Sequence, residues 1–370
     1  MASRVAPQGS RWRPVIAATP RHLLVPRWWE TADRGGWELR DGPQNPAGWL
    51  PAAYDDQTLV TRVGTRHADH ATAGDTLDDV RPTSSATHPG LVVDMLQAVD
   101  IYDGADVLDV ATGSGYSAAL LARSLGDAHV TSVDIDPYLV DVAAGRLEEQ
   151  DLHPAMLACD ATGPIPGSYD RIVSMVAVRP IPPSWLAVLR PGGRLVTVLS
   201  RTSLLIVADK VEDGTAVGRV AWEPVTFMAA RTGDGYPPRL RQRLVETWEL
   251  DGESCGTGRY PVVDIGRARH LATMLELTIP GVETHFIVGR DGEHVARLVH
   301  PDGSWARASG APDALPVVHQ GGPHRLWDLV DDARHRAAMD GTLPVRGAAV
   351  HIHTDGRISL MNGTWHAEIR

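Results

Sequence analysis

The residues with the clearest chemical meaning lie between Asp109 and Ala118, where two glycines follow an acid at the end of an apolar run. Gly113 and Gly115 allow a tight backbone turn and leave no side chain between that turn and a bound molecule. The helix expected after the turn directs unpaired N–H groups and the positive end of its dipole to the same place. The pattern therefore predicts a site for a ligand with an anionic group.

Three acids around this turn indicate which ligand it would bind. Asp109 ends the strand before the glycines, where it would attract an ammonium group and repel a pyrophosphate. Asp134, 21 residues after Gly113, can accept hydrogen bonds from ribose hydroxyls. Asp160 can accept one from an adenine amino group. An amino acid, a ribose and an adenine together describe S-adenosyl-L-methionine.

The predicted cofactor-binding residues are Asp109, Ala111, Thr112, Gly113, Ser114, Gly115, Tyr116, Asp134, Ile135, Asp160 and Ala161. The turn Leu189–Val196 (Leu-Arg-Pro-Gly-Gly-Arg-Leu-Val) also recurs in methyltransferases that use this cofactor. Two other interpretations stay open. The glycine motif also occurs in nicotinamide-dependent oxidoreductases, and the whole pattern could be ordinary turn chemistry in an α/β core.

Strand-like and helix-like segments alternate from about residue 83 to 231, which predicts a parallel sheet with helices on both faces. The expected strands are 106–111, 129–134, 170–178 and 193–199, and the expected helices are 90–99, 116–125, 139–150 and 185–189. A hairpin turning at 212–214 follows. Beyond it we expect strands in 277–281, 284–289, 293–309 and 349–362, with one helix over 324–338.

Length and composition predict how these elements are divided among domains and which partners the chain has. A chain of 370 residues exceeds the roughly 250–300 at which one hydrophobic core stops growing. We expect an N-terminal substrate-side extension (1–80), a cofactor-binding core (81–235) and a C-terminal α+β unit (236–370), with a hinge at Pro237–Pro238. The net charge of −11 argues against a nucleic-acid partner. Two cysteines, no signal-like N-terminus and no long apolar stretch predict a cytoplasmic protein without a membrane partner.

The chain resembles the protein-L-isoaspartate O-methyltransferases in five motifs that occur in the same order. Val107–Ala122 is similar to the family's cofactor turn, and Arg21–Pro26 to its Arg-x-x-Phe-Val-Pro segment. Tyr54–Leu59 precedes the expected active-site loop, and the remaining motifs are Tyr169–Ile172 and Ile181–Pro182. The resemblance covers residues 20–200. It implies a doubly wound, Rossmann-like sheet of seven strands in the order 3-2-1-4-5-7-6.

The substrate loop departs from that family's pattern. The family's Thr-Ile-Ser-Gln-Pro appears here as Ser85-Ala-Thr87-His88-Pro89, so Thr87 takes the place of its active-site serine. We expect Thr87 to orient the reacting carboxylate, with Ser85 and His88 beside it, although Thr87 could also be only the N-cap of the next helix. Four tryptophans in the N-terminal region could form a peptide groove: Trp28, Trp29, Trp37 and Trp49.

The chain also runs about 135 residues past the family's core, which resembles a branch that modifies ribosomally made peptides alongside lanthipeptide, lasso-peptide or ATP-grasp maturases. This resemblance implies methylation of an Asp or isoAsp carboxylate in a precursor peptide, leading to aspartimide or isoaspartate. Two alternatives are a general enzyme that repairs isoaspartyl proteins and a cofactor-binding partner subunit without catalysis. The His67/His70 and His351/His353 pairs have no third ligand in the sequence pattern, so we expect no metal site.

Overall fold

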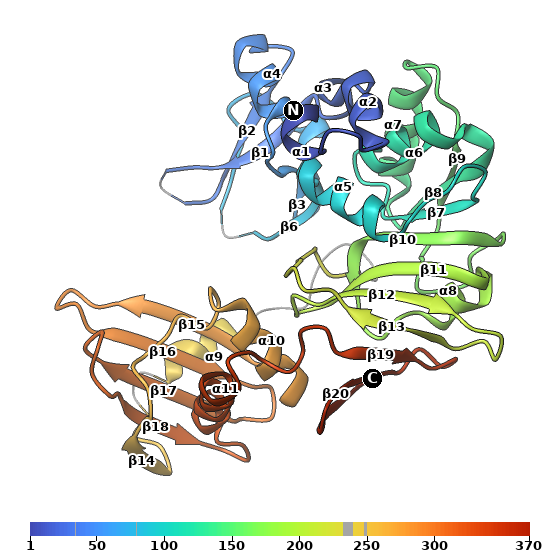
Figure 1. The fold of residues 1–370 in the computed structure, drawn as a ribbon. Helices are drawn as coiled ribbons and strands as arrows, with labels where there is room; N and C mark the ends of the chain where they lie inside the picture. The colour runs from blue at the N-terminus through green and yellow to red at the C-terminus, as the bar shows by residue number, and fades with distance from the viewer. Residues whose placement is uncertain (34, 79, 232–239, 248–249) are drawn as a thin grey trace.

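The described residues form three β-sheets with helices packed around them (Figure 1). The computed structural model describes all 370 residues except 34, 79, 232–239 and 248–249. The predicted hinge at Pro237–Pro238 and the predicted boundary at residue 235 therefore lie outside the described residues.

The central sheet contains the predicted alternation of strands and helices. Its parallel strands follow the order β9-β8-β7-β10-β11, and the antiparallel strands β12, β13, β19, β20 and β21 extend it from β11. These strands are β7 (Val107–Val110), β8 (Val130–Asp134), β9 (Ala155–Ala158), β10 (Tyr169–Val178), β11 (Leu189–Leu199), β12 (Leu205–Lys210), β13 (Ala216–Val220), β19 (Ala349–Ile352), β20 (Ile358–Asn362) and β21 (Trp365–Ile369).

The doubly wound, Rossmann-like class is confirmed, but the implied order of the last two core strands is wrong. The hairpin predicted at 212–214 forms as β12 and β13, and β12 rather than β13 pairs with β11. A simple hairpin leaves its first strand beside the preceding one, so the order becomes 5-6-7. The sheet also has ten strands instead of seven, because β19–β21 add to the free edge of β13.

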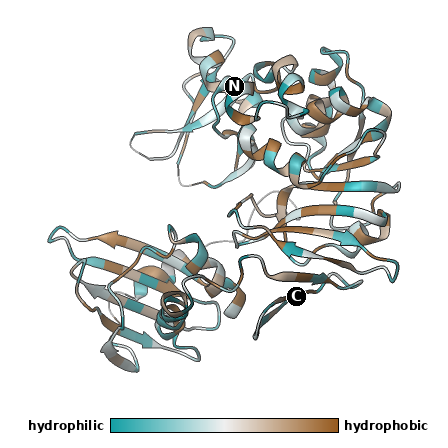
Figure 2. Cartoon of the chain, in the orientation of Figure 1, coloured by the Kyte–Doolittle hydropathy of each residue, from teal (hydrophilic) through white to brown (hydrophobic). Residues whose placement is uncertain are grey.

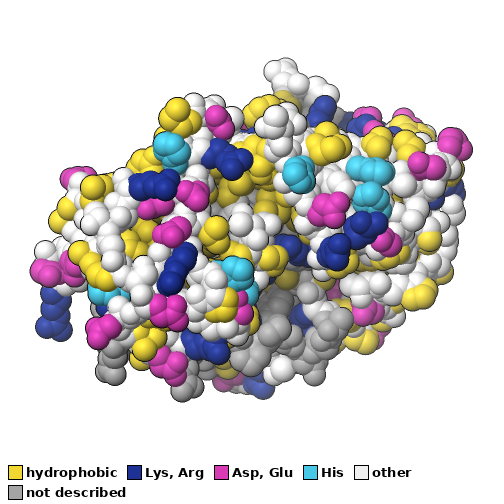
Figure 3. All heavy atoms as spheres, turned by 90° about the horizontal axis from the view of Figure 1, so that it is seen from below, with side chains coloured by type: hydrophobic (Ala, Val, Ile, Leu, Met, Phe, Trp, Pro, Cys, Tyr) yellow, Lys and Arg dark blue, Asp and Glu magenta, His cyan; other side chains and the backbone are white. Residues whose placement is uncertain are grey.

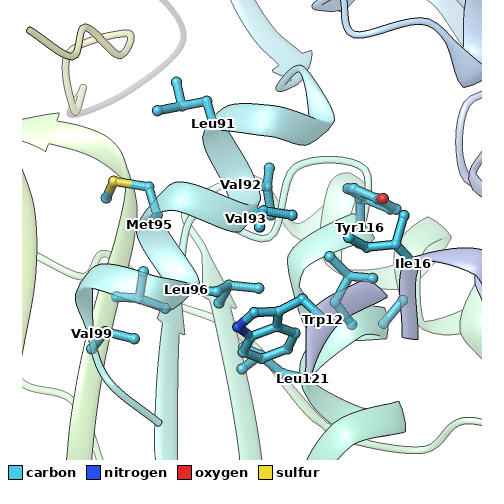
Figure 4. Packing of buried hydrophobic residues seen from close by; sticks show 14 of the residues in the cluster. Trp12, Ile16, Leu91, Val92, Val93, Met95, Leu96, Val99, Tyr116 and Leu121 are labelled. Atoms are coloured by element: carbon cyan, nitrogen blue, oxygen red, sulfur yellow. The ribbon is translucent and has the colours of Figure 1, made fainter. Parts of the chain in front are cut away.

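Helices cover both faces of the central sheet. They are α5 (Pro89–Ala98), α6 (Tyr116–Leu125), α7 (Pro137–Glu148) and α8 (Pro183–Val188), with the short turn η2 (Asp127–His129). One core lies between α5, α6, the N-terminal helix α2 and one face of the sheet (Figure 4). The other lies under α8 and includes the inner faces of β13 and β19–β21. Hydrophobic and hydrophilic positions alternate along these helices (Figure 2), and many of the apolar ones lie in these two cores.

The N-terminal part has its own sheet. Its elements are α1 (Ala2–Val5), α2 (Trp12–Ala18), α3 (Arg21–Leu24), β1 (Arg27–Thr31), β2 (Trp37–Asp41), α4 (Pro46–Tyr54), β3 (Leu59–Val63), β4 (Arg66–His67), η1 (Ala68–His70), β5 (Thr76–Leu77) and β6 (Pro82–Ala86). Strand β6, whose last two residues begin the predicted substrate segment, pairs with β3. Trp28 and Trp29 are buried in two hydrophobic cores, so packing and not a peptide groove accounts for them.

The third sheet lies in the C-terminal part. Its elements are α9 (Arg241–Glu246), β14 (Ser254–Thr257), α10 (Arg269–Thr278), β15 (Glu283–Val288), β16 (His294–Val299), β17 (Trp305–Gly310), β18 (Val317–Gly321) and α11 (Leu326–Asp340). The strand expected at 277–281 is wrong: Leu277 and Thr278 end α10, and Ile279 is its C-cap. Residues 349–369 pair with the central sheet, so the expected 236–370 unit is shared between two sheets.

The C-terminal part contacts the core through buried polar groups. Glu276 of α10 forms ion pairs with Arg179 and Arg201 at 3.1 and 3.0 Å. Thr273 Oγ1 accepts from the backbone N–H of Ser203 at 3.0 Å. On the face seen in Figure 3, acidic, basic and histidine side chains are interspersed rather than gathered by sign. Among the described residues, no helix is long and apolar enough to cross a membrane.

Candidate functional site

A cavity opens at the carboxyl ends of β7, β8 and β10, where ligands of open α/β sheets bind. Three of the predicted site residues do not line it: Asp109, Gly115 and His88. The predicted residues that do are Ser85, Thr87, Ala111, Thr112, Gly113, Ser114, Tyr116, Asp134, Ile135, Asp160 and Ala161. The fold thus brings the predicted cofactor turn and the predicted substrate segment to one cavity.

The glycine turn closes tightly against its neighbours. Gly113 and Gly115 have φ of 51° and 83°, and Ala111 also has a positive φ, 73°. A Cβ on Gly113 would lie 3.4 Å from the Ser85 carbonyl of β6, and one on Gly115 would lie 3.1 Å from the Cβ of Ala143 in α7. Gly115 is therefore needed for the packing of α6 on α7, which explains why it does not line the cavity.

Asp134 lies at the end of β8 and points into the cavity. Its Oδ2 accepts from the backbone N–H of Gly113 at 3.0 Å, and its Oδ1 from that of Asp136 at 3.1 Å. Burial raises the pKa of this carboxyl, and the two N–H donors oppose that effect. Each oxygen keeps a second lone pair, so the carboxylate can still accept hydroxyl donors such as those of a ribose.

Asp109 lies behind the cavity wall and is fully buried. Its Oδ2 accepts from the hydroxyls of Ser117 and Ser132 at 2.9 and 2.8 Å. Ser132 in turn shares a 2.7 Å hydrogen bond with Thr112, and both Thr112 and Ser117 line the cavity. Asp109 was expected to contact the ligand directly. In the structure its carboxyl group is separated from the cavity by a layer of hydroxyl groups.

The second oxygen of Asp109 bears on which ligand this wall would accept. Oδ1 is buried and has no hydrogen-bond partner among the residues that the structure describes. Burial raises the pKa of this carboxyl to about 7, although the two serine donors lower it. A nearby cation would stabilise the ionised form, because opposite charges interact strongly where water is excluded.

Asp160 and Ala161 lie on the loop after β9 and line the cavity. Asp160 is exposed, and its Oδ1 accepts from the backbone N–H and the hydroxyl of Thr162 at 2.8 and 2.6 Å. The indole N–H of Trp185 donates to the Ala161 carbonyl at 2.7 Å and fixes the loop against α8. Asp160 keeps Oδ2 for an amino donor.

The substrate segment enters the cavity through Ser85 and Thr87. His88 caps α5 instead of Thr87, since its Nδ1 accepts from the backbone N–H of Leu91 at 3.2 Å. The alternative in which Thr87 serves as the N-cap is therefore wrong. His88 is turned toward Asp56, whose Oδ1 lies 3.3 Å from the same Nδ1, and so lies outside the cavity lining.

Arg21 is a residue whose contribution the sequence did not reveal, although it belongs to one of the five motifs. Its guanidinium is completely buried and donates to the backbone carbonyls of Ala53, Gln57, Ala86 and Thr87 at 2.7–3.2 Å. It also lies over the ring of Tyr116, with 5.6 Å from Cζ to the ring centroid. Burial lowers its pKa to about 10, which leaves it charged at neutral pH. Arg21 therefore holds the substrate segment against the cofactor turn.

Replacing Arg21 by Leu is expected to reduce both stability and turnover. Four backbone carbonyls, two of them in fully buried contacts, would lose donors, and an unsatisfied buried acceptor costs about 1–3 kcal/mol. We expect the free energy of unfolding to fall by ~3 kcal/mol in urea titrations. Arg21→Lys keeps the charge but not the planar array of donors. Its free energy of unfolding should therefore lie between those of wild type and Arg21→Leu. Wild-type stability in Arg21→Leu would show that these hydrogen bonds contribute nothing.

The sequence also did not predict the segment 227–231, which we call the roof of the cavity. Residues 227–231 run alongside the end of β10, where the Ala177 N–H donates to the Met228 carbonyl at 2.8 Å and the Ala230 N–H donates to the Ala177 carbonyl at 2.6 Å. Phe227, Met228 and Arg231 line the cavity with Met175 of β10. No spacing or composition signal marks this segment, because it depends on one local pairing between distant parts of the chain.

Comparisons with known proteins agree with this site. The family model described as protein-L-isoaspartate(D-aspartate) O-methyltransferase (PCMT) matches residues 66–234. A protein-L-isoaspartate O-methyltransferase of Anaeromyxobacter dehalogenans is 37% identical over 153 residues, covering 38% of this chain and 72% of that protein. One of Methanothrix thermoacetophila is 37% identical over 203 residues, covering 54% and 78%. The chain belongs to the protein-L-isoaspartate O-methyltransferase family. It is a carboxyl methyltransferase whose cofactor is S-adenosyl-L-methionine.

A solved protein-L-isoaspartate O-methyltransferase aligns with 99% of this chain and 95% of its own, with 17% sequence identity and a TM-score of 0.48. The cavity of this chain fits the family's cofactor on its own geometry. The buried, unpartnered oxygen of Asp109 suits a nearby cation, and the bare turn at Gly113 leaves room for a ligand. We propose that Asp134 would hold the ribose and Asp160 the adenine.

Proposed function

We propose that this enzyme esterifies the side-chain carboxylate of an Asp, or the free carboxylate of an isoAsp, in a peptide. The observation that supports this most is that Ser85 and Thr87 share one cavity with the cofactor turn. A carboxylate held by these hydroxyls would lie beside the cofactor without crossing solvent. When bound, the cofactor supplies an activated methyl group on a positively charged sulfur.

The chain needs no general base for this reaction. A carboxyl group with a pKa of about 3.9 is ionised at pH 7 by roughly a thousand to one. The residues of the site therefore have to bind, orient and desolvate the acceptor, and correct orientation alone can lower a barrier by ~7–11 kcal/mol. We assign orientation to Thr87, with Ser85 beside it, and no proton transfer to either. His88 lies outside the lining and would act on the substrate only from the rim.

We further propose that the substrate is a ribosomally made precursor peptide that is modified in the cytoplasm. The altered substrate segment at Ser85–His88 and the elements beyond the core support this choice. A methyl ester on Asp is attacked by the backbone nitrogen of the next residue. That step forms a C–N bond, releases methanol and leaves an aspartimide, which water can open to isoaspartate. The C-terminal sheet would then serve peptide recognition.

General repair of isoaspartyl proteins is the alternative that the family match favours. Competition between two substrates distinguishes peptide modification from repair. The substrates are a short linear isoaspartyl peptide and a peptide whose Asp lies in a macrocycle. We expect a kcat/KM at least tenfold higher for the constrained Asp peptide, with methyl ester and methanol as products. Esterification of the isoaspartyl peptide alone would overturn the proposal in favour of repair. Binding of S-adenosyl-L-homocysteine without ester on either peptide would favour a partner subunit that lacks catalysis.

A further inference from the structure

Asp136 lies at a junction between three parts of the chain. It follows the proposed ribose-binding acid by two residues, and its Oδ1 caps α7 by accepting from the backbone N–H of Tyr138 at 3.2 Å. Its Oδ2 faces two arginines and a histidine from elsewhere. His67 Nε2 of β4 lies 3.1 Å away, Arg62 Nε of β3 3.7 Å, and Arg231 Nη2 of the roof 3.8 Å.

This junction is shielded from water, so its charges contribute strongly to stability. The side chains of Arg62 and Asp136 are only 5% and 12% exposed, and those of His67 and Arg231 are 9% exposed. Exposed ion pairs contribute little to stability, whereas loss of one member of a buried set leaves charges that water cannot solvate. The carboxylate of Asp136 therefore joins three parts of the chain: the N-terminal sheet, the roof and the N-terminus of α7.

The junction is also connected directly to the cavity. The backbone N–H of Asp136 donates to Asp134 Oδ1 at 3.1 Å, so a shift of residue 136 removes one of the two donors that orient Asp134. Arg231 itself lines the cavity. A change in the contacts that β3 and β4 make with Asp136 would therefore shift Asp134 and the roof, which both line the cavity.

We propose that Asp136 is a positioning residue, whose negative charge couples the N-terminal sheet to closure of the cofactor cavity. The inference rests on the proposed assignment of Asp134 to the ribose. Asp136 does not touch the ligand in this account. It keeps Asp134 oriented and keeps the 227–231 roof drawn toward the N-terminal sheet.

Asp69 provides a matched control at the same interface. Its Oδ2 accepts from Arg146 Nη2 at 2.8 Å and from Tyr138 Oη at 3.2 Å, so it also joins the N-terminal part to α7. Its side chain is 22% exposed, and among the described residues it makes no direct hydrogen bond or ion pair with Asp134 or with the roof. Asp69→Asn should therefore weaken the interface without disturbing the cavity.

The test compares S-adenosyl-L-homocysteine binding by calorimetry with the melting temperature of the ligand-free protein. Asp136→Asn keeps a capping oxygen and removes the charge, so we expect its Kd to rise at least tenfold. In Asp69→Asn the Kd should stay within twofold for a similar drop in melting temperature. Equal effects on Kd in the two variants, or an unchanged Kd in Asp136→Asn, would overturn the proposal.

Two more variants keep the test decisive. Should Asp136→Asn fail to fold, His67→Gln removes the shortest contact to Oδ2 and is expected to raise the Kd three- to tenfold, and an unchanged Kd would again overturn the coupling. Asp134→Ala examines the underlying assignment. A Kd unaffected by Asp134→Ala would refute the ribose role itself, whereas a weakened Kd there beside normal binding in Asp136→Asn would refute only the coupling.

Discussion

Asp109→Asn is expected to make the ligand-free protein more stable at pH 8 and to weaken S-adenosyl-L-homocysteine binding by about 10–100-fold. Asn can still accept from Ser117 and Ser132, but it removes the buried negative charge. That charge is costly without a ligand and favourable near the ammonium group of a bound one. Opposite signs for stability and binding are therefore the expected result.

The pH dependence follows from the direction of the pKa shift. Burial raises the pKa of Asp109 to about 7 from its ordinary value near 3.8. The protonated carboxyl is favoured in the folded state, so this contribution to stability is complete below about pH 3.8 and is lost as the pH rises through 7. A shift of this size corresponds to ~4 kcal/mol.

Thermal melts of wild type and Asp109→Asn between pH 5 and 8 measure this contribution, and calorimetry with S-adenosyl-L-homocysteine measures the effect on binding. The variant should already melt higher than wild type at pH 5, and the difference should widen up to about pH 7 and then level off. A variant that is less stable than wild type at pH 8, or that binds the ligand normally, would contradict the role of Asp109.

Thr87→Ala is expected to lower kcat by about two orders of magnitude with little change in cofactor affinity or stability. The Thr87 hydroxyl would orient the nucleophilic carboxylate, and misplacement of a reacting group by about 1 Å can cost about 10²-fold in rate. His88 caps α5, so Thr87 has no capping contribution to lose. Turnover with an Asp peptide, Kd for S-adenosyl-L-homocysteine and melting temperature should be measured together.

Thr87→Ser is the matched control, because it keeps the hydroxyl and removes only a methyl group. Its kcat should stay within about tenfold of wild type. An unaffected rate in Thr87→Ala would leave the carboxylate to Ser85 or to backbone donors. A fall in melting temperature as large as that of Arg21→Leu would instead indicate a structural role.

Local patterns predicted the elements that position the cofactor. The helix at 116–125 and the strand at 129–134 lie where their apolar spacing and the glycine turn require, and the structure has α6 at Tyr116–Leu125 and β8 at Val130–Asp134. These elements depend on contacts between residues close in sequence, so their signal is local. The cavity residues from Ala111 to Tyr116 could be predicted for the same reason, with Gly115 as the exception.

Features that depend on distant partners could not be predicted. Addition of β19 to β13 joins residues more than 100 positions apart, and nothing in residues 349–352 names that partner. Arg21 looks like an ordinary surface arginine until the carbonyls of Ala86 and Thr87 surround it. The segment 277–281 (Leu-Thr-Ile-Pro-Gly) was expected to form a strand, but the apolar spacing of Leu271, Met274 and Leu275 continues a helix into it.

A crystal structure with S-adenosyl-L-homocysteine tests the central claim most directly, because the account depends on one cavity holding the cofactor beside Thr87. We predict ligand density against Gly113, with its amino group on the Asp109 side and its ribose hydroxyls at Asp134. Its sulfur should face Ser85 and Thr87. A ligand bound elsewhere, or a sulfur turned away from this segment, would contradict both the site and the reaction assigned to it.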